Sequence, residues 1–291
     1  MYSTPILYIV FNRPEETAKS FEVFRKLKPS KLYIAADGAR HGRQDDVENT
    51  KKVKAIVSQI DWDCDIKTLF HPTNLGCRVA VQTALDWFFE NETEGIIIED
   101  DIIPNDGFFE FCETMLERYR DDERILTING CSLGYQNDKQ PYGKTRYFNM
   151  WGWATWRSSV VKVKETWANY NPHIPLQADP IMKKNLRLPI LFDGNALWSR
   201  YWEALFIKVY EDKINTWDYQ WCYTVLKPTR FASGLHRITL STLEAVNLRR
   251  TIILMKLRFS ILYIPHHITL TKKLILSKSI LNTRYSTLVP S

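Results

Sequence analysis

Apolar runs of strand length alternate with helical segments between residues 5 and 128, and this alternation limits the fold more than any other feature of the chain. The apolar runs occupy residues 5–11, 32–36, 66–70, 95–98 and 125–128. Between them, apolar residues recur at helical spacing in segments that begin near 14, 47, 79 and 108. Strands that alternate with helices join through right-handed crossovers, so the sequence predicts an α/β fold whose mostly parallel sheet is flanked by helices.

Polar residues follow four of these runs, at the point where each strand should end. Arg13 follows the first run, Asp37 the second, a polar stretch after Phe70 the third, and the acidic triplet 99–101 the fourth. Ligands of parallel α/β sheets bind in the crevice at the carboxyl ends of the strands. We therefore expect these groups to line one ligand site.

The acidic triplet consists of Glu99, Asp100 and Asp101, directly after an apolar strand. Like charges held this close repel one another, and a bound cation removes that cost. One or two carboxylates, together with diphosphate oxygens and water, suit Mg²⁺ or Mn²⁺. The alternative interpretation is an acidic loop that faces solvent.

Charge is unevenly distributed along the chain. Residues 235–291 hold nine of the 39 Lys and Arg residues but only one of the 33 acids, so residues 1–234 hold 30 basic and 32 acidic residues. The formal net charge of +6 therefore belongs to the tail, and the body is not a nucleic-acid binder. The tail also contains no glycine. We predict a domain over 1–234 and a separate basic tail over 235–291.

We expect no export or membrane-insertion signal in this sequence. It contains no run of 18 apolar residues, and its amino terminus lacks the basic start of a signal peptide. The five cysteines are odd in number and never form a C-x-x-C pair, which argues against a disulfide framework or a zinc knuckle. These features favour a cytoplasmic location.

Six short motifs occur in order along residues 3–226, at 11–14, 36–38, 74–78, 99–101, 150–156 and 217–221. Together they resemble the motifs of nucleotide-diphospho-sugar glycosyltransferases of the GT-A fold. The similarity is greatest to the N-acetylglucosaminyltransferase I group and to bacterial relatives described as hemolytic-protein-like. The resemblance implies a Rossmann-like GT-A sheet and a nucleotide-diphosphate-sugar as donor substrate.

The resemblance also implies roles for the acidic triplet. Asp101 would bind Mn²⁺ or Mg²⁺ directly, with the phosphates of the donor completing much of the coordination shell. Asp100 would accept a hydrogen bond from the ribose or the sugar. Glu99 would hold the neighbouring loop or the donor sugar.

Three further positions are implied to contact the donor. Arg13 and Asp37 would frame the nucleotide base, and Arg78 would lie near the diphosphate or the triplet. Each position has a structural alternative. Arg13 could cap a loop, Asp37 could form an Asp-Gly turn, and Arg78 could be a surface residue.

Asp218 stands between Trp217 and Tyr219, and the resemblance implies that it is the catalytic base. An inverting transferase must remove a proton from the acceptor hydroxyl as that oxygen attacks the anomeric carbon. The implied acceptor is a glycan, such as a bacterial surface polysaccharide. The alternative for Asp218 is a helix N-cap. The tryptophans of segment 150–156 are either core residues or an apolar platform for a sugar ring.

The tail departs from the resembled family, which continues after the Trp-Asp pair with a glycine-bearing loop that closes over the donor. Codons can be chosen for 236–254 so that the neighbouring reading frame restores such a loop. We therefore interpret the tail as the product of a frameshift near Gly234. The alternative is a native basic tail that contacts the anionic inner surface of the membrane.

Two other functions remain as alternatives to an active glycosyltransferase. The first is a catalytically impaired module that binds a sugar nucleotide and has lost its carboxyl-terminal lid. The second is a sugar-nucleotide pyrophosphorylase. Such enzymes usually carry a glycine-rich basic loop after the first strand, and segment 11–14 is not of that kind.

Overall fold

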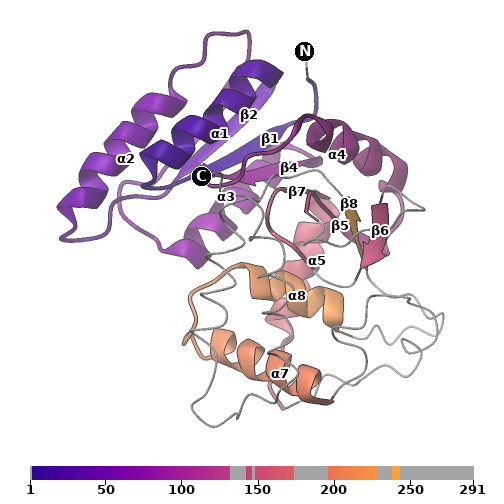
Figure 1. Cartoon of the computed structure of the whole chain (residues 1–291). Helices are drawn as coiled ribbons and strands as arrows, with labels where there is room; N and C mark the ends of the chain where they lie inside the picture. The colour runs from indigo at the N-terminus through magenta and orange to yellow at the C-terminus, as the bar shows by residue number, and fades with distance from the viewer. Residues whose placement is uncertain (1, 132–141, 146–147, 174–195, 228–237, 243–291) are drawn as a thin grey trace, which may run out of the picture. The chain divides into compact units, whose positions relative to one another are not determined.

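The computed structural model describes residues 2–131, 142–145, 148–173, 196–227 and 238–242 (Figure 1). The chain divides into two compact units, Met1–Asn247 and Leu248–Ser291. Every described residue belongs to the first unit. Of the predicted basic tail, 235–291, only 238–242 lies within the described residues.

All nine elements that the hydrophobic pattern predicts are present. They are β1 (Ile6–Val10), α1 (Pro14–Leu27), β2 (Lys31–Ala36), α2 (Gln44–Val57), β3 (Asp65–Phe70), α3 (Cys77–Asn91), β4 (Glu94–Glu99), α4 (Asp106–Tyr119) and β5 (Ile125–Asn129). Further along the chain follow β6 (Tyr142–Thr145), β7 (Trp153–Trp156), α5 (Arg157–Ala168), α7 (Ala196–Tyr210), α8 (Asp218–Leu226) and β8 (Ile238–Thr242).

The described strands form one sheet in the order β3-β2-β1-β4-β7-β5-β8-β6. Strands β1 to β4 pair in parallel, and β5 pairs in parallel with β8. Strand β7 runs antiparallel to both β4 and β5, and β6 runs antiparallel to β8. The predicted α/β class with a mostly parallel sheet is therefore confirmed.

Helices cover both faces of this sheet. On one face, the alternate β1 residues Ile6 and Tyr8 pack into a core with Phe21 and Phe24 of α1. Helix α2 lies beside α1, as Figure 1 shows. On the other face, the ring of Tyr33 in β2 meets the ring of Phe88 in α3, with centroids 4.9 Å apart. Because both faces are covered, β1 and the middle of β4 consist of apolar residues on both faces.

The first helix shows how local sequence fixes an element next to the site. Pro14 occupies the first turn of α1, where its missing N–H costs nothing, and acidic residues follow it. The helix ends at Lys28, whose φ of 50° is left-handed. These signals place the start of α1 directly after Arg13.

Strand β8 belongs to the segment that the sequence assigns to the basic tail. It pairs with β5 and β6 and so lies inside the first compact unit. The reading-frame interpretation of the tail stays a prediction. Among the described residues, none of the helices combines the length and apolar character needed to cross a bilayer.

Gly130, just after β5, supplies a test of the core. A Cβ atom there would overlap the ring of Phe108 and lie 2.7 Å from the carbonyl oxygen of Gly152. We expect Gly130→Ala to lower the free energy of unfolding by about 1–3 kcal/mol, since neither neighbour can move freely. Urea denaturation measures the change.

The matched control is Gly107→Ala in α4, where the nearest atom to a new Cβ is 3.8 Å away. That variant should be as stable as the wild type or slightly more stable, because alanine favours a helix over glycine. Equal stability of the two variants would contradict the packing described for Gly130.

Candidate active site

The carboxyl ends of β1, β2 and β4 meet at one edge of the sheet. In the register of the strands, Ile9 of β1 pairs with Glu99 of β4, and Val10 pairs with Ala36 of β2. The polar residues that follow these strands therefore start from neighbouring positions. This edge is the one predicted from the sequence.

Arg13 joins the end of β1 to the acidic triplet. Its guanidinium lies 2.6 Å from Oδ2 of Asp101 and 3.0 Å from Oδ1 of Asp100. The backbone N–H of Phe11 also donates to the Asp100 carboxylate, at 3.2 Å. The side chain of Asp100 is 2% exposed and that of Asp101 is 22% exposed. Asp100 is thus the buried anchor of this end, and Asp101 is the carboxylate that a ligand can reach.

Arg13 does not neutralise the whole triplet. Burial, together with the negative charges of Asp101 and Asp100, raises the pKa of Glu99 to about 8. Burial also raises the pKa of Asp100 to about 7, although the charge of Arg13 lowers it. The triplet therefore relieves part of its repulsion by keeping protons at neutral pH, and the cation that the sequence predicts for this edge stays a prediction.

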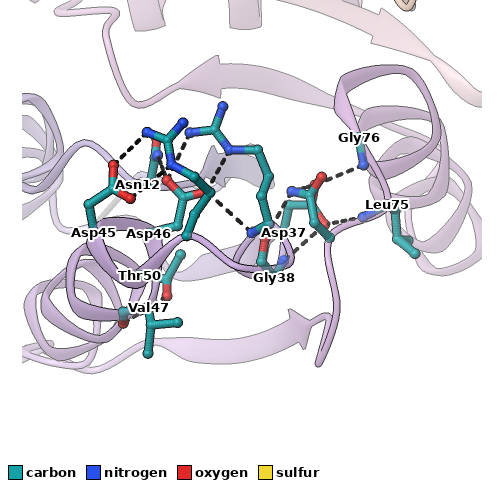
Figure 2. Close-up of polar contacts among 12 residues, drawn as sticks. Asn12, Asp37, Gly38, Asp45, Asp46, Val47, Thr50, Leu75 and Gly76 are labelled. Atoms are coloured by element: carbon teal, nitrogen blue, oxygen red, sulfur yellow. Dashed lines mark hydrogen bonds and ion pairs between the residues drawn. The ribbon is translucent and has the colours of Figure 1, made fainter.

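Asp37 lies at the end of β2 and is 8% exposed. Its carboxylate accepts hydrogen bonds from the N–H groups of Gly38, Leu75 and Gly76, at 2.8, 2.8 and 3.1 Å, and from the amide of Asn74 at 2.8 Å (Figure 2). Asp37 thereby fixes the loop that precedes α3. Its predicted hydrogen bond to a nucleotide base stays a prediction, and these four donors already surround both oxygens.

A second buried carboxylate, Asp46 at the start of α2, was not singled out in the sequence. It is fully buried and accepts from the Asn12 amide at 2.6 Å and from the Arg40 guanidinium at 2.8 Å (Figure 2). The hydrogen bonds from Arg40 hold the pKa of Asp46 well below its usual range. This contact fixes the residue before Arg13, but no sequence signal pairs positions 34 residues apart.

Asp218 begins α8 and is 8% exposed. The hydroxyl of Thr216 donates to its carboxylate. Burial raises the pKa of Asp218, against the lowering effect of that hydrogen bond. The charge of Asp218 is among those that raise the pKa of Glu99, after burial and the charges of Asp101 and Asp100. The role of Asp218 as a base stays a prediction.

An aromatic cluster surrounds the start of α8. The ring of Trp217 stacks on Trp153 with centroids 5.7 Å apart, and Trp221 and Phe148 complete the cluster. Trp153 is fully buried and Trp156 nearly so. These two tryptophans of segment 150–156 are therefore core residues: Trp153 packs α8 against the sheet, and Trp156 belongs to the core that α1 and α4 cover.

Arg78, the second residue of α3, forms an ion pair with Asp212 in the loop between α7 and α8. Its backbone N–H donates to Oδ1 of Asn215 in the same loop, at 3.1 Å. The predicted contact of Arg78 with a diphosphate stays a prediction. In the structure, its observed partners belong to the loop that leads to Asp218.

Cys77, the first residue of α3, lies within the predicted motif 74–78, and the residue is exposed. Desolvation of the sulfur by neighbouring groups raises the pKa of its thiol to about 11, and the charges of Glu99 and Asp218 add to this effect. The thiol therefore stays protonated at neutral pH and is a poor nucleophile. The charges that act on Cys77 come from Glu99 of β4 and Asp218 of α8.

No group of three His, Cys, Asp or Glu side chains with the arrangement of a metal centre occurs among the described residues. A divalent cation at Asp101 would therefore take most of its ligands from a bound molecule. The partly exposed carboxylate of Asp101 offers an oxygen ligand of the kind that Mg²⁺ and Mn²⁺ bind.

No protein-family model matches this sequence, and no curated protein matches it either. Several solved structures are similar to part of this chain. One is S. aureus TarS, with a TM-score of 0.38 and 12% identity over 57% of this chain and 49% of that chain. The described chain thus spans about half the length of that TarS structure.

Two other structures are similar over a comparable part of the chain. HddC from Yersinia pseudotuberculosis has a TM-score of 0.31 and 10% identity over 54% of this chain and 78% of that chain. The 4-diphosphocytidyl-2C-methyl-D-erythritol synthase from Anaerococcus prevotii has a TM-score of 0.33 and 10% identity, over 58% and 78%.

The raised pKa of Glu99 predicts a pH-dependent stability. Its folded-state pKa of about 8 exceeds the ordinary value of 4.5, so its contribution to stability is present at low pH and is lost as the pH rises through 8. We expect Glu99→Gln to melt at a higher temperature than the wild type at pH 9 and at nearly the same temperature at pH 5. Circular dichroism at the two pH values measures this.

The control is Glu110→Gln, which changes an exposed glutamate on α4. It should follow the wild type at both pH values. If the melting temperature of Glu99→Gln differs from that of the wild type by the same amount at pH 5 and pH 9, the folded state does not disfavour ionisation of Glu99.

Proposed function

We propose that this chain is a metal-dependent glycosyltransferase, which moves a sugar from a nucleotide-diphosphate-sugar to a hydroxyl of a glycan acceptor with inversion. The observation that carries this proposal is the presence of two acidic groups in different surroundings, one just after β4 and one on the helix packed against the neighbouring strand β7. The accessible Asp101 pairs with Arg13, and the buried Asp218 follows Trp217, whose ring stacks on Trp153 of β7.

In the proposed displacement, Asp101 serves the leaving diphosphate and Asp218 serves the attacking hydroxyl. Asp101 is the ligand for Mn²⁺ or Mg²⁺, which would offset the charge that grows on the leaving diphosphate. Arg13, Asp37, Arg78, Glu99 and Asp100 are the proposed donor-binding residues. Of these, Arg13 offers a guanidinium that is 46% exposed, although it is already oriented by a buried carboxylate.

Asp218 is the proposed general base. The acceptor oxygen forms a bond to the anomeric carbon from the face opposite the diphosphate, the bond from that carbon to the diphosphate oxygen breaks, and the acceptor proton passes to the Asp218 carboxylate. Burial raises the pKa of Asp218, which makes its ionised form a stronger base than an exposed aspartate.

The second candidate is a module that binds a sugar nucleotide without turning it over. It is favoured by the tail, which lacks the glycine-bearing loop of the resembled family. An assay of UDP-sugar hydrolysis and transfer with Mn²⁺ separates the two. Turnover that EDTA abolishes supports the transferase, whereas donor binding without turnover supports the module.

Asp101→Asn should remove the Mn²⁺-dependent part of donor binding. The side chain is accessible and bonded to Arg13, so the change should leave the fold intact. Calorimetric titration of UDP with and without Mn²⁺ measures the effect. Asp86→Asn on α3, whose partner is Lys164, serves as the control. If Mn²⁺ strengthens UDP binding to Asp101→Asn as much as to the wild type, Asp101 is not a metal ligand.

Asp218→Asn should lower the rate of transfer by about two to four orders of magnitude, the usual worth of a positioned base. This corresponds to about 3–5 kcal/mol of transition-state stabilisation. Donor affinity should stay nearly unchanged, because the base acts on the acceptor. The N-cap of α8 is Trp217, and Asp218 is its first helical residue, so the N-cap alternative for Asp218 does not hold. Full transfer activity in this variant would eliminate the assignment.

A further inference from the structure

The loop between α7 and α8 is tied to the start of α3 by contacts that the proposed displacement does not itself use. Oδ1 of Asn215 accepts the backbone N–H of Arg78 at 3.1 Å, and the Arg78 guanidinium pairs with Asp212. More than 130 positions separate these partners in the sequence. Arg78 is the donor in both contacts, one through its backbone and one through its side chain, so a single residue of α3 holds the loop at two positions.

Gly76 shows how closely the two segments approach. Its φ of 79° favours glycine, and a Cβ atom there would lie 2.8 Å from Nδ2 of Asn215. The N–H of the same glycine donates to the Asp37 carboxylate. The start of α3 is therefore held from one side by Asp37 and meets Asn215 on the other.

The same loop leads directly to the proposed base. Thr216 follows Asn215, and its hydroxyl donates to the carboxylate of Asp218. The carbonyl oxygen of Thr216 accepts a hydrogen bond from the Gln220 amide at 3.4 Å, which joins the loop to the first turn of α8. A shift of Asn215 would therefore move the group that orients the base.

We propose that Asn215 is a positioning residue, which holds Asp218 at the carboxyl edge of the sheet through the start of α3. This inference rests on the proposed function. It also gives Arg78 a role in building the site, through Asp212 and Asn215. Asn215 is exposed, so its hydrogen bond adds little to overall stability, whereas a small displacement of a catalytic group can lower a rate by two orders of magnitude.

The test uses Asn215→Ala in the full chain. We expect turnover at saturating donor and acceptor to fall about tenfold or more, with UDP affinity and melting temperature close to those of the wild type. Hydrogen exchange should be faster at the Arg78 amide and across 212–218. Asn215→Asp keeps the acceptor atom and should restore most of the turnover. Lys213→Ala, whose partner is Glu211 in the same loop, is the control and should change neither readout.

Unchanged turnover in Asn215→Ala would overturn the proposal, as would exchange at the Arg78 amide equal to that of the wild type. Failure of Asn215→Asp to restore turnover would also overturn it, because the acceptor atom would then not be what matters. If the wild type itself transfers no sugar, the proposed function fails and the positioning role fails with it. Faster exchange in Asn215→Ala would in that case show the contact to be structural only.

Discussion

Three consecutive carboxylates at the end of β4 repel one another, and the guanidinium of Arg13 is the group that holds two of them in place. The rest of the edge is arranged around this contact. The hydroxyl of Ser20 in α1 donates to the backbone carbonyl of Asp100 at 3.0 Å. The helix that follows Arg13 therefore also supports the segment just after β4, where the partners of Arg13 lie. Because Pro14 starts α1 immediately after the arginine, the guanidinium has little freedom to leave the triplet. The compensation is incomplete, since Glu99 remains a carboxylate that burial and its neighbours keep from ionising.

The acids of this edge fall into two groups by what surrounds them. Asp37, Asp46 and Asp100 are buried, and each accepts hydrogen bonds from a neighbouring loop or strand end. Such carboxylates serve as fixed acceptors that gather several donors. Asp101 is accessible and has one partner side chain, and the observed donors to the buried Asp218 are all local, the Thr216 hydroxyl and the N–H groups of Asp218 and Tyr219. Burial alone would not have separated the two groups, whereas the origin of the donors does.

The sequence predicts the fold well where local periodicity carries the information. The first nine elements follow from apolar runs and helical spacing, and Arg13 and Asp101, which follow two of the predicted strands, contact each other in the structure. It does not predict that β7 inserts between β4 and β5, because that order depends on pairing between distant segments. The same limit applies inside the site. The contacts of Asp46 with Asn12 and of Arg78 with Asp212 join positions whose spacing follows no period, so only the folded chain shows them.

The tryptophans near Asp218 connect packing to chemistry. Two uses of such rings, a core and a stacking platform, are equally consistent with their spacing in the sequence, and the burial of Trp153 and Trp217 decides for the core. In that position they still affect the reaction, because rings that exclude water around the start of α8 also desolvate the Asp218 carboxylate. Desolvation disfavours the charged form and raises the pKa, and a carboxylate of raised pKa binds a proton more readily when one is offered. The aromatic cluster would then tune the base without touching a sugar, while Thr216 and the loop before it determine where that base points.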